Sequence, residues 1–135
     1  MGEQPAADLK AKTVVVGVTG GIAAYKACEV VSSLTKLGAQ VYVIMTRAAT
    51  KLVQPLTFQT LSGHPVFVDM WEAPKLWNVE HIALAERADL VLIAPATANI
   101  VGKIAGGICD DLLSTVVAAT TAPVLIPLLS RVMPA

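Results

Sequence analysis

The sequence predicts a three-layer α/β domain in which a parallel β-sheet carries helices on both faces. Short runs of β-branched and aliphatic residues alternate with segments whose apolar residues recur at helical spacing. The composition is 55% hydrophobic but only 4% aromatic, so the core must be built mainly from aliphatic side chains. Strands that are buried on both faces have this character, which favours a parallel sheet over an antiparallel one.

The first part of the chain reads as a strand, a glycine turn, a helix and a second strand. Residues 14–18 are the first strand, which ends at Gly20 and Gly21. Gly38 is expected to end the helix, and residues 41–45 form the next apolar strand. The helix itself is marked by four apolar residues at helical spacing: Ala24, Ala27, Val31 and Leu34.

The middle of the chain is expected to contain two short helices and a short strand. The helices cover residues 48–54 and 56–62 and are separated by Pro55. A strand over residues 66–68 follows. Residues 69–78 are irregular in pattern and hold both tryptophans of the chain, Trp71 and Trp77, which makes this segment a candidate interface loop.

The last part repeats the alternation of helices and buried strands. A helix is expected over residues 82–87, and an apolar strand over 90–94 runs into a loop that starts at Pro95. A helix over residues 100–105 is broken at two glycines. Asp110 or Asp111 is then placed to cap a helix over residues 112–119. Residues 123–127 supply the last strand.

Charge and composition exclude several classes of function. Ten basic and ten acidic residues cancel, so no surplus positive field holds nucleic acid or an anionic membrane surface. The most apolar stretch, residues 112–129, is interrupted by threonines and prolines and does not read as a membrane span. Residues 1–12 are expected to be a disordered tail without the apolar region of a secretion signal, so a cytoplasmic location is expected.

The two cysteines do not indicate a disulfide or a zinc site. Cys28 lies in a helical pattern, and Cys109 lies in a distant segment. Neither belongs to a C-x-x-C motif or stands near a matching cluster of histidines. We therefore expect no bound metal.

Three loops at the carboxyl ends of the predicted strands are candidates for ligand binding. In open parallel sheets, ligands bind at this edge, where the direction of winding reverses. The loop at residues 17–21 is rich in small residues, so its backbone N–H groups can approach a phosphate near the start of a helix. The second loop contains Thr46 and Arg47, and the third covers residues 95–99.

The glycine turn does not match the dinucleotide-binding fingerprint. That fingerprint needs G-x-G-x-x-G and an acidic residue about 20 positions later. Here the glycines are Gly17, Gly20 and Gly21, and the second strand ends in Thr46 and Arg47. NAD is therefore disfavoured, whereas the phosphate of NADP or of FMN remains possible.

Five stretches of the sequence resemble motifs of one protein family, in the family's order. They are residues 17–26, 55–63, 81–85, 88–99 and 110–114. Together they resemble the flavoprotein domain of the phosphopantothenoylcysteine decarboxylases, over most of the chain from Thr13 to Ile126. Peptidyl-cysteine decarboxylases of lantibiotic synthesis share that fold.

The resemblance implies a flavodoxin-like (Rossmann-like) sheet that holds FMN, in a homotrimer or an assembly of trimers with active sites at subunit boundaries. The reaction implied is the FMN-dependent decarboxylation of phosphopantothenoylcysteine to phosphopantetheine in coenzyme A biosynthesis, with the redox chemistry carried by the flavin. The resemblance also implies a set of cofactor-binding residues, drawn from four segments: Thr19, Gly20, Gly21, Ile22, Thr46, Phe58, Pro95, Ala96, Thr97 and Asn99.

His81 aligns with the catalytic histidine of the family, and an imidazole that titrates near neutrality can accept a thiol proton. For several other residues, a structural role is an alternative to a role in binding or catalysis. Phe58 either packs in the core or contributes to the flavin pocket of a neighbouring subunit. Asn99 contacts the flavin, caps the following helix, or does both. Asp110 and Asp111 are expected to cap a helix rather than to form a catalytic pair.

The sequence departs from the family pattern after residue 126. The family continues with a P-x-M-N-x-x-M-W motif, whose asparagine binds the substrate carboxylate, and with a flap that carries a reactive cysteine. Residues 127–135 contain neither. We therefore expect a flavoprotein domain over residues 13–135, truncated or altered after residue 126, that binds FMN and decarboxylates poorly.

Three other functions stay open at this point. The chain could be a non-catalytic flavin-binding or regulatory subunit of the same family, or a peptidyl-cysteine decarboxylase. An NADP-dependent oxidoreductase is supported only by the glycine turn and Arg47.

Overall fold

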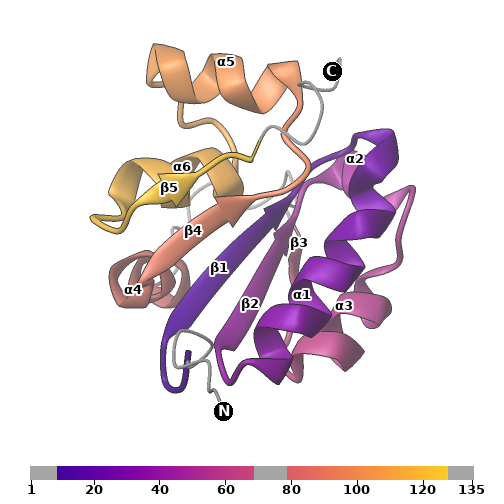
Figure 1. Cartoon of the computed structure of the whole chain (residues 1–135). Helices are drawn as coiled ribbons and strands as arrows, with labels where there is room; N and C mark the ends of the chain where they lie inside the picture. Colours follow the sequence, from indigo (N-terminus) through magenta and orange to yellow (C-terminus); the bar gives the residue numbers. More distant parts are fainter. Residues whose placement is uncertain (1–8, 69–78, 128–135) are drawn as a thin grey trace.

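A single parallel sheet of five strands organises the protein (Figure 1). The computed structural model describes residues 9–68 and 79–127. The strand order is β3-β2-β1-β4-β5, which is the order found in Rossmann-like folds and places the reversal of winding between β1 and β4. The strands are β1 (Thr13–Val18), β2 (Gln40–Met45), β3 (Phe67–Val68), β4 (Leu90–Ile93) and β5 (Val124–Leu125).

The register of the three central strands brings their carboxyl ends to the same edge. Val18 of β1 is paired with Met45 of β2, and Gly17 is paired with Ile93 of β4. The backbone hydrogen bonds continue just past these strands. The Thr46 N–H donates to the Val18 carbonyl over 3.0 Å, and the Ala94 N–H donates to the Gly17 carbonyl over 3.0 Å. The loops that follow β1, β2 and β4 therefore start side by side.

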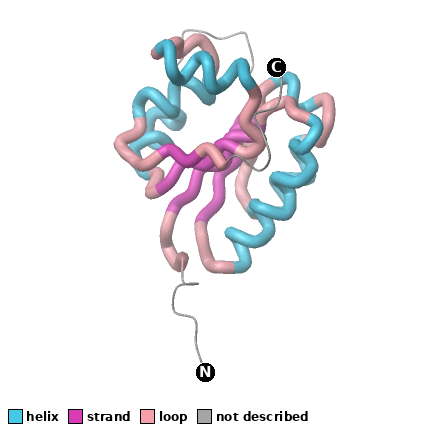
Figure 2. Tube along the Cα trace, turned by 45° about the horizontal axis from the view of Figure 1, so that its top comes forward, coloured by secondary structure: helices cyan, strands magenta, loops and turns pink. Residues whose placement is uncertain are grey.

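Helices cover both faces of the sheet, as Figure 2 shows. The core on one face includes residues of α1 (Lys26–Lys36), α2 (Arg47–Thr50) and α3 (Pro55–Ser62). The core on the other face includes residues of α4 (Val79–Arg87), α5 (Ala98–Gly106) and α6 (Leu112–Ala119). The predicted three-layer α/β fold is confirmed.

Side chains of β1 alternate between the two cores. Val14, Val16 and Val18 pack toward α1 and α3, whereas Val15 packs toward α4 and α6. Because β1 is covered on both sides, Val15, Val16 and Val18 have no exposed surface. This double burial is what the continuous run of valines predicts.

Local signals in the sequence account for most element ends. Gly38 follows α1 with φ 96° and Gly107 follows α5 with φ 71°, a left-handed conformation that glycine adopts without steric cost. Pro55 is the first residue of α3. Asp111 caps α6 and forms a capping box with Ser114, so the predicted capping role is confirmed for Asp111.

Several elements are shorter than the sequence predicts. A 3-10 helix at Ile22–Tyr25 precedes α1, and α2 ends at Thr50 because the chain must be extended at Gln54, before Pro55. Strands β3 and β5 contain only Phe67–Val68 and Val124–Leu125. Both are edge strands, which pair on one side only. Trp71 and Trp77 lie outside the described residues.

His64 joins the turn before β3 to β2. Its Nδ1 lies 3.0 Å from the Val41 carbonyl oxygen, and its ring stacks on Tyr42 with 4.2 Å between centroids. The guanidinium of Arg87 lies 5.4 Å from the centroid of the Tyr42 ring. These contacts tie the end of α4 and the turn before β3 to the amino end of β2.

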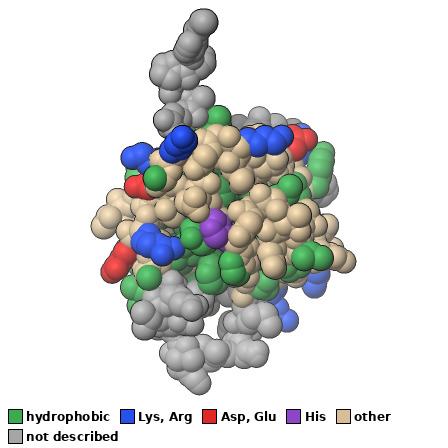
Figure 3. Space-filling view, turned by 90° about the horizontal axis from the view of Figure 1, so that it is seen from below, with side chains coloured by type: hydrophobic (Ala, Val, Ile, Leu, Met, Phe, Trp, Pro, Cys, Tyr) green, Lys and Arg blue, Asp and Glu red, His purple; other side chains and the backbone are tan. Residues whose placement is uncertain are grey.

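The surface seen in Figure 3 carries basic and acidic side chains scattered among apolar and polar ones. This distribution agrees with the equal numbers of basic and acidic residues in the chain. Among the residues that the structure describes, no helix is both long enough and apolar enough to cross a membrane.

Gly17 provides a test of the packing between β1 and α6. A Cβ atom at Gly17 would lie 2.6 Å from Cδ1 of Leu113, which is fully buried. We expect Gly17→Ala to lower the free energy of unfolding by about 1–3 kcal/mol through overpacking. Chemical denaturation measures this change, and combining it with Leu113→Ala should make the two effects strongly non-additive.

Gly102→Ala is the matched control. A Cβ at Gly102, inside α5, meets nothing within 4 Å. Alanine is the better helix former by about 1 kcal/mol, so this variant should be at least as stable as the parent. A Gly17→Ala variant as stable as Gly102→Ala would contradict the described packing.

Candidate functional site

A cleft of about 260 Å³ lies at the carboxyl ends of β1, β2 and β4. This is the edge where ligands bind in open parallel sheets. Five residues implied by the family resemblance line it: Thr19, Gly20, Thr46, Thr97 and Asn99. The rest of the lining was not among the predicted cofactor contacts: Arg47, Ala48, Ile100, Lys103, Asp110 and Asp111.

The loop after β1 is held against two neighbouring elements. Thr19 is only 2% exposed, and its hydroxyl donates a hydrogen bond of 2.5 Å to the Pro95 carbonyl in the loop after β4. A Cβ atom at Gly20 would lie 2.5 Å from Cβ of Ala48 in α2. Gly20 therefore lets the loop approach α2 closely, and its backbone borders the cleft.

Two threonines cap the helices that begin at the cleft. Thr46 Oγ1 accepts a 3.3 Å hydrogen bond from the Ala49 N–H at the start of α2. Thr97 Oγ1 accepts a 3.3 Å hydrogen bond from the Ile100 N–H at the start of α5. Both helix N-termini therefore lie at the cleft, where their partial positive charge favours an anion.

The proposed capping role of Asn99 is wrong. An N-cap residue has an extended backbone, and Thr97 has this conformation, with φ −99° and ψ 161°. Asn99 is the second residue of α5, is exposed and lines the cleft. Its side chain is therefore available to a ligand.

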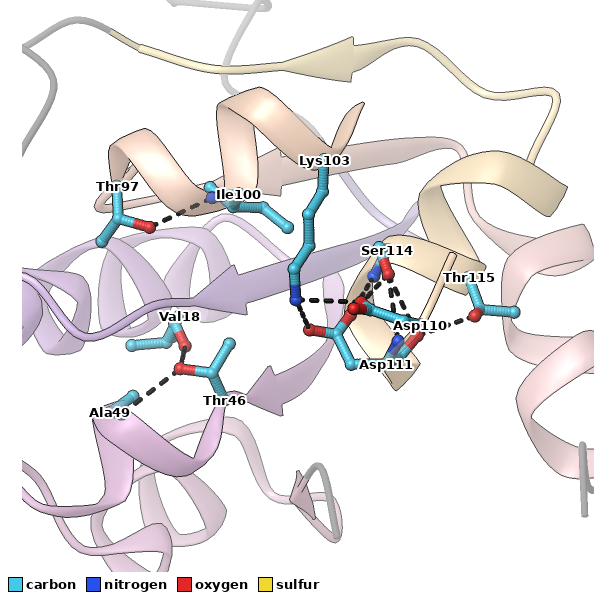
Figure 4. A network of polar contacts seen from close by, with 10 residues as sticks. All are labelled: Val18, Thr46, Ala49, Thr97, Ile100, Lys103, Asp110, Asp111, Ser114 and Thr115. Carbon is cyan, nitrogen blue, oxygen red and sulfur yellow. Dashed lines mark hydrogen bonds and ion pairs between the residues drawn. The ribbon is translucent and has the colours of Figure 1, made fainter. Parts of the chain in front are cut away.

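Lys103, which also lines the cleft, joins two carboxylates, as Figure 4 shows. Its Nζ lies 3.0 Å from Oδ1 of Asp110 and 2.8 Å from Oδ2 of Asp111. The side chains of Lys103 and Asp111 are 17% and 16% exposed, whereas that of Asp110 is 59% exposed. The other carboxylate oxygen of Asp111 accepts hydrogen bonds from the Ser114 N–H over 2.9 Å and from its hydroxyl over 2.6 Å.

Burial and hydrogen bonding oppose each other in this cluster. Burial raises the pKa of the Asp111 carboxyl, but hydrogen bonds from Lys103 and Ser114 outweigh it and leave that pKa below its ordinary value. Burial likewise lowers the pKa of Lys103, and its bonds to Asp111 and Asp110 outweigh that effect and raise it. Both shifts favour the charged forms of Lys103 and Asp111 at neutral pH. With one lysine and two aspartates, the cluster has a formal net charge of −1.

Some predicted site residues lie elsewhere. Pro95 and Ala96 are buried and are not among the lining residues of the cleft, and Gly21 is buried with an ordinary extended backbone. Phe58 has no exposed surface and packs in the core beside α1, and its contribution to the flavin pocket of a neighbouring subunit stays a prediction.

The side chains of Ile22 and His81 lie outside the described part of the structure. Ile22 is the first residue of the 3-10 helix, and His81 belongs to the first turn of α4. Their predicted contacts therefore stay predictions.

Lys103 is the main site residue that the sequence analysis missed. It stands four residues after Asn99 and three after Ile100, which places it on the same side of the helix. A lysine on that stripe, followed by two aspartates in the next loop, is the signal that would have indicated it.

The described geometry defines a class of protein: an α/β domain with a small cleft for an anionic ligand at its topological switch point. The chain belongs to the Flavoprotein family, whose model matches residues 3–133.

Curated relatives agree with this assignment. The chain is 50% identical over 118 residues to the coenzyme A biosynthesis bifunctional protein CoaBC of Bacillus subtilis, covering 87% of this chain and 29% of that protein. It is 45% identical over 118 residues to CoaBC of Escherichia coli K12, with the same shares covered. The chain thus spans less than a third of the length of these relatives.

Solved structures share the fold. The FMN-dependent cysteine decarboxylase SpaF superposes with a TM-score of 0.76 at 34% identity, covering 87% of this chain and 68% of that one. A PPC decarboxylase mutant complexed with pantothenoylaminoethenethiol superposes with a TM-score of 0.68 at 30% identity, covering 85% of this chain and 65% of that one.

The Asp111 carboxylate makes a stability contribution that depends on pH. Because its folded pKa is lowered, the contribution is present above the ordinary carboxyl pKa of about 3.9 and is lost as pH falls through the folded value. We expect Asp111→Asn to cost about 1.5–3 kcal/mol at pH 7 and much less once the pH has fallen below the folded pKa of Asp111. Asparagine caps helices as well as aspartate does, so the comparison isolates the charge.

Denaturant unfolding across this pH range measures the difference in the free energy of unfolding between parent and variant. Asp110→Asn is the control, because Asp110 is largely exposed and its loss leaves the Lys103–Asp111 pair in place. If the difference in the free energy of unfolding between parent and Asp111→Asn does not become smaller as the pH falls, the carboxylate charge is not what stabilises the contact between α5 and the start of α6.

Proposed function

We propose that this chain is the FMN-binding domain, residues 13–135, of a flavin-dependent decarboxylase that converts phosphopantothenoylcysteine to phosphopantetheine in coenzyme A biosynthesis. One observation carries the proposal: residues from three separate family motifs or strand ends, Gly20, Thr46 and Asn99, meet in a single cleft at the switch point of the sheet. The identity to CoaBC proteins and the fold shared with a PPC decarboxylase support the reaction.

The residues of the cleft fit FMN. Gly20 packs against Ala48 and borders the cleft, and two helices begin beside it. Arg47 is exposed on the same wall and offers a positive charge to one phosphate. In this proposal Gly20, Thr46 and Arg47 hold the phosphate, and Asn99 contacts another part of the cofactor. When bound, FMN supplies a two-electron acceptor next to the cysteine of the substrate.

We assign the proton transfer to His81. An imidazole changes its charge near neutral pH, so it can accept the proton that the substrate thiol must lose. His81 is in the first turn of α4, a helix whose residues Leu84 and Ala85 are anchored in the core. This anchoring gives the proposed base a fixed backbone position.

A peptidyl-cysteine decarboxylase is the second candidate function. It is favoured by the superposition with the FMN-dependent cysteine decarboxylase SpaF, whose TM-score is 0.76. The two candidates use the same cofactor and differ in whether the cysteine is at the end of a pantothenoyl group or of a peptide. A non-catalytic flavin-binding subunit is the third candidate, and it predicts a yellow protein that releases CO2 from neither substrate.

We further propose a cytoplasmic homotrimer or an assembly of trimers. The cleft of about 260 Å³ is slightly smaller than the usual range of about 300–1,000 Å³ for ligand pockets, which is consistent with a cofactor that is enclosed in part by a second chain. Light scattering of the purified protein should give the mass of a trimer or a multiple of it. A well-folded monomer at micromolar concentration would rule this assembly out.

The cofactor proposal predicts a yellow protein that releases FMN rather than FAD. Gly21→Asp should give a colourless protein, because Gly21 directly follows the cleft-lining Gly20 and an acidic side chain there repels the phosphate. Because Gly21 is buried, circular dichroism has to show that the variant is folded before the loss of colour counts. Absorbance at visible wavelengths and chromatography of the released flavin measure both effects. Gly102→Ala is the control and should retain FMN. Parent protein that stays colourless after incubation with FMN would refute the cofactor.

The catalytic proposal predicts that His81→Asn binds FMN normally and loses decarboxylation by about 100-fold or more, as expected for removal of a general base. CO2 release from phosphopantothenoylcysteine in single turnovers measures the chemical step, and a cysteine-terminated peptide tests the second candidate. His64→Asn is the matched control, because His64 is bonded to the Val41 carbonyl and is not among the lining residues of the cleft. A parent with CO2 release clearly above the rate without protein, matched by an equal rate in His81→Asn, would exclude His81 as the base.

A further inference from the structure

The cleft that is proposed to bind a negatively charged cofactor is itself lined by two carboxylates. FMN brings a phosphate of about −1.5 to −2 charge at neutral pH. Two of the residues lining the cleft, Asp110 and Asp111, are acidic. The charged residues that line it with them are Arg47 of α2 and Lys103 of α5. An anionic ligand therefore binds well only if nearby positive charges offset the negative charge of these carboxylates.

Lys103 is positioned to offset the charge of these two carboxylates. Its side chain is 17% exposed, and its Nζ contacts both carboxylates, at 3.0 Å and 2.8 Å. Asp111 also has a structural role, because its carboxylate caps α6 through Ser114. Without Lys103 the wall would carry two negative charges a few ångströms apart.

We infer that Lys103 is a specificity-determining residue that makes this wall of the cleft tolerant of an anionic cofactor by cancelling one of the two carboxylate charges. This inference rests on the proposed FMN site and deepens it. Lys103 acts through Asp110 and Asp111, so it is a positioning residue and takes no part in the chemistry. Its ammonium contributes one positive charge at a fixed place, and the net charge of the wall is −1 with it and −2 without it.

The charge of the cluster can be changed in both directions. Lys103→Met makes the net charge −2 and should weaken FMN binding severalfold, because the additional net negative charge of the wall repels the phosphate within the same cleft. Asp110→Asn makes the net charge zero and should tighten binding relative to the parent. Asp110 is largely exposed, so this second variant tests the inference without risk to folding.

Two further variants separate charge from contact. Lys103→Arg retains the positive charge and should bind FMN within about twofold of the parent. The double variant Lys103→Met with Asp110→Asn lacks the ion pairs but restores the net charge of −1, and it should recover most of the lost affinity. Lys36→Met is the matched control, because it removes one exposed lysine from the end of α1, and Lys36 is not among the lining residues of the cleft.

The experiment titrates the apo form of the full 135-residue chain with FMN by fluorescence quenching, at low salt and at 0.5 M NaCl, a concentration at which charge effects are largely screened over about 4–5 Å. The inference is supported if affinity follows net charge across the four variants and the loss in Lys103→Met narrows at high salt. It is overturned if the double variant stays as weak as Lys103→Met, or if Asp110→Asn binds no tighter than the parent. Parent protein that binds no FMN would instead refute the proposed function on which the inference rests.

Discussion

The parallel pairing of β1 with β2 on one side and β4 on the other is the constraint on which the site depends. Because the register ends at Val18–Met45 and Gly17–Ile93, the chain leaves all three strands at nearly the same height. The winding reverses between β1 and β4, so the loops after these strands lead to helices on opposite faces and leave a gap. The cleft is therefore a consequence of topology, and side chains only decide what it accepts.

Small residues and short hydrogen bonds then fix the shape of this gap. The Thr19 hydroxyl bonds to the Pro95 carbonyl, which joins the loops after β1 and β4. On the other side Gly20 lies so close to Ala48 that any larger residue would separate the loop from α2. Both residues are therefore constrained by packing whether or not a ligand is bound. Glycine at such a turn is evidence for a cofactor only together with the residues around it.

The sequence predicted the layers of the fold better than the details of the site. Runs such as Val14 to Val18 identify a doubly buried strand because burial on both faces leaves no choice of residue type. Edge strands lack this constraint, and β3 and β5 proved shorter than their apolar runs. The Asn99 cap was wrong because the helix begins earlier than its apolar pattern indicates, so that the extended residue before it is Thr97. Lys103 was missed because its partners lie in the next loop, and that contact is tertiary.

The needs of the fold and of the proposed function meet at Asp111. Helix α6 requires an acceptor at its N-terminus, and Asp111 supplies it with two hydrogen bonds to Ser114. The same carboxylate lines a cleft that, in our proposal, must accept a phosphate. A neutral cap such as serine would avoid the conflict, but it would also lose the ion pair that joins α5 to the start of α6. Lys103 resolves the conflict because its ammonium has two effects. It forms the ion pair that joins α5 to the start of α6, and it lowers the negative charge of the cleft wall. In our proposal, stability and ligand selection therefore depend on the same pair of side chains, Lys103 and Asp111.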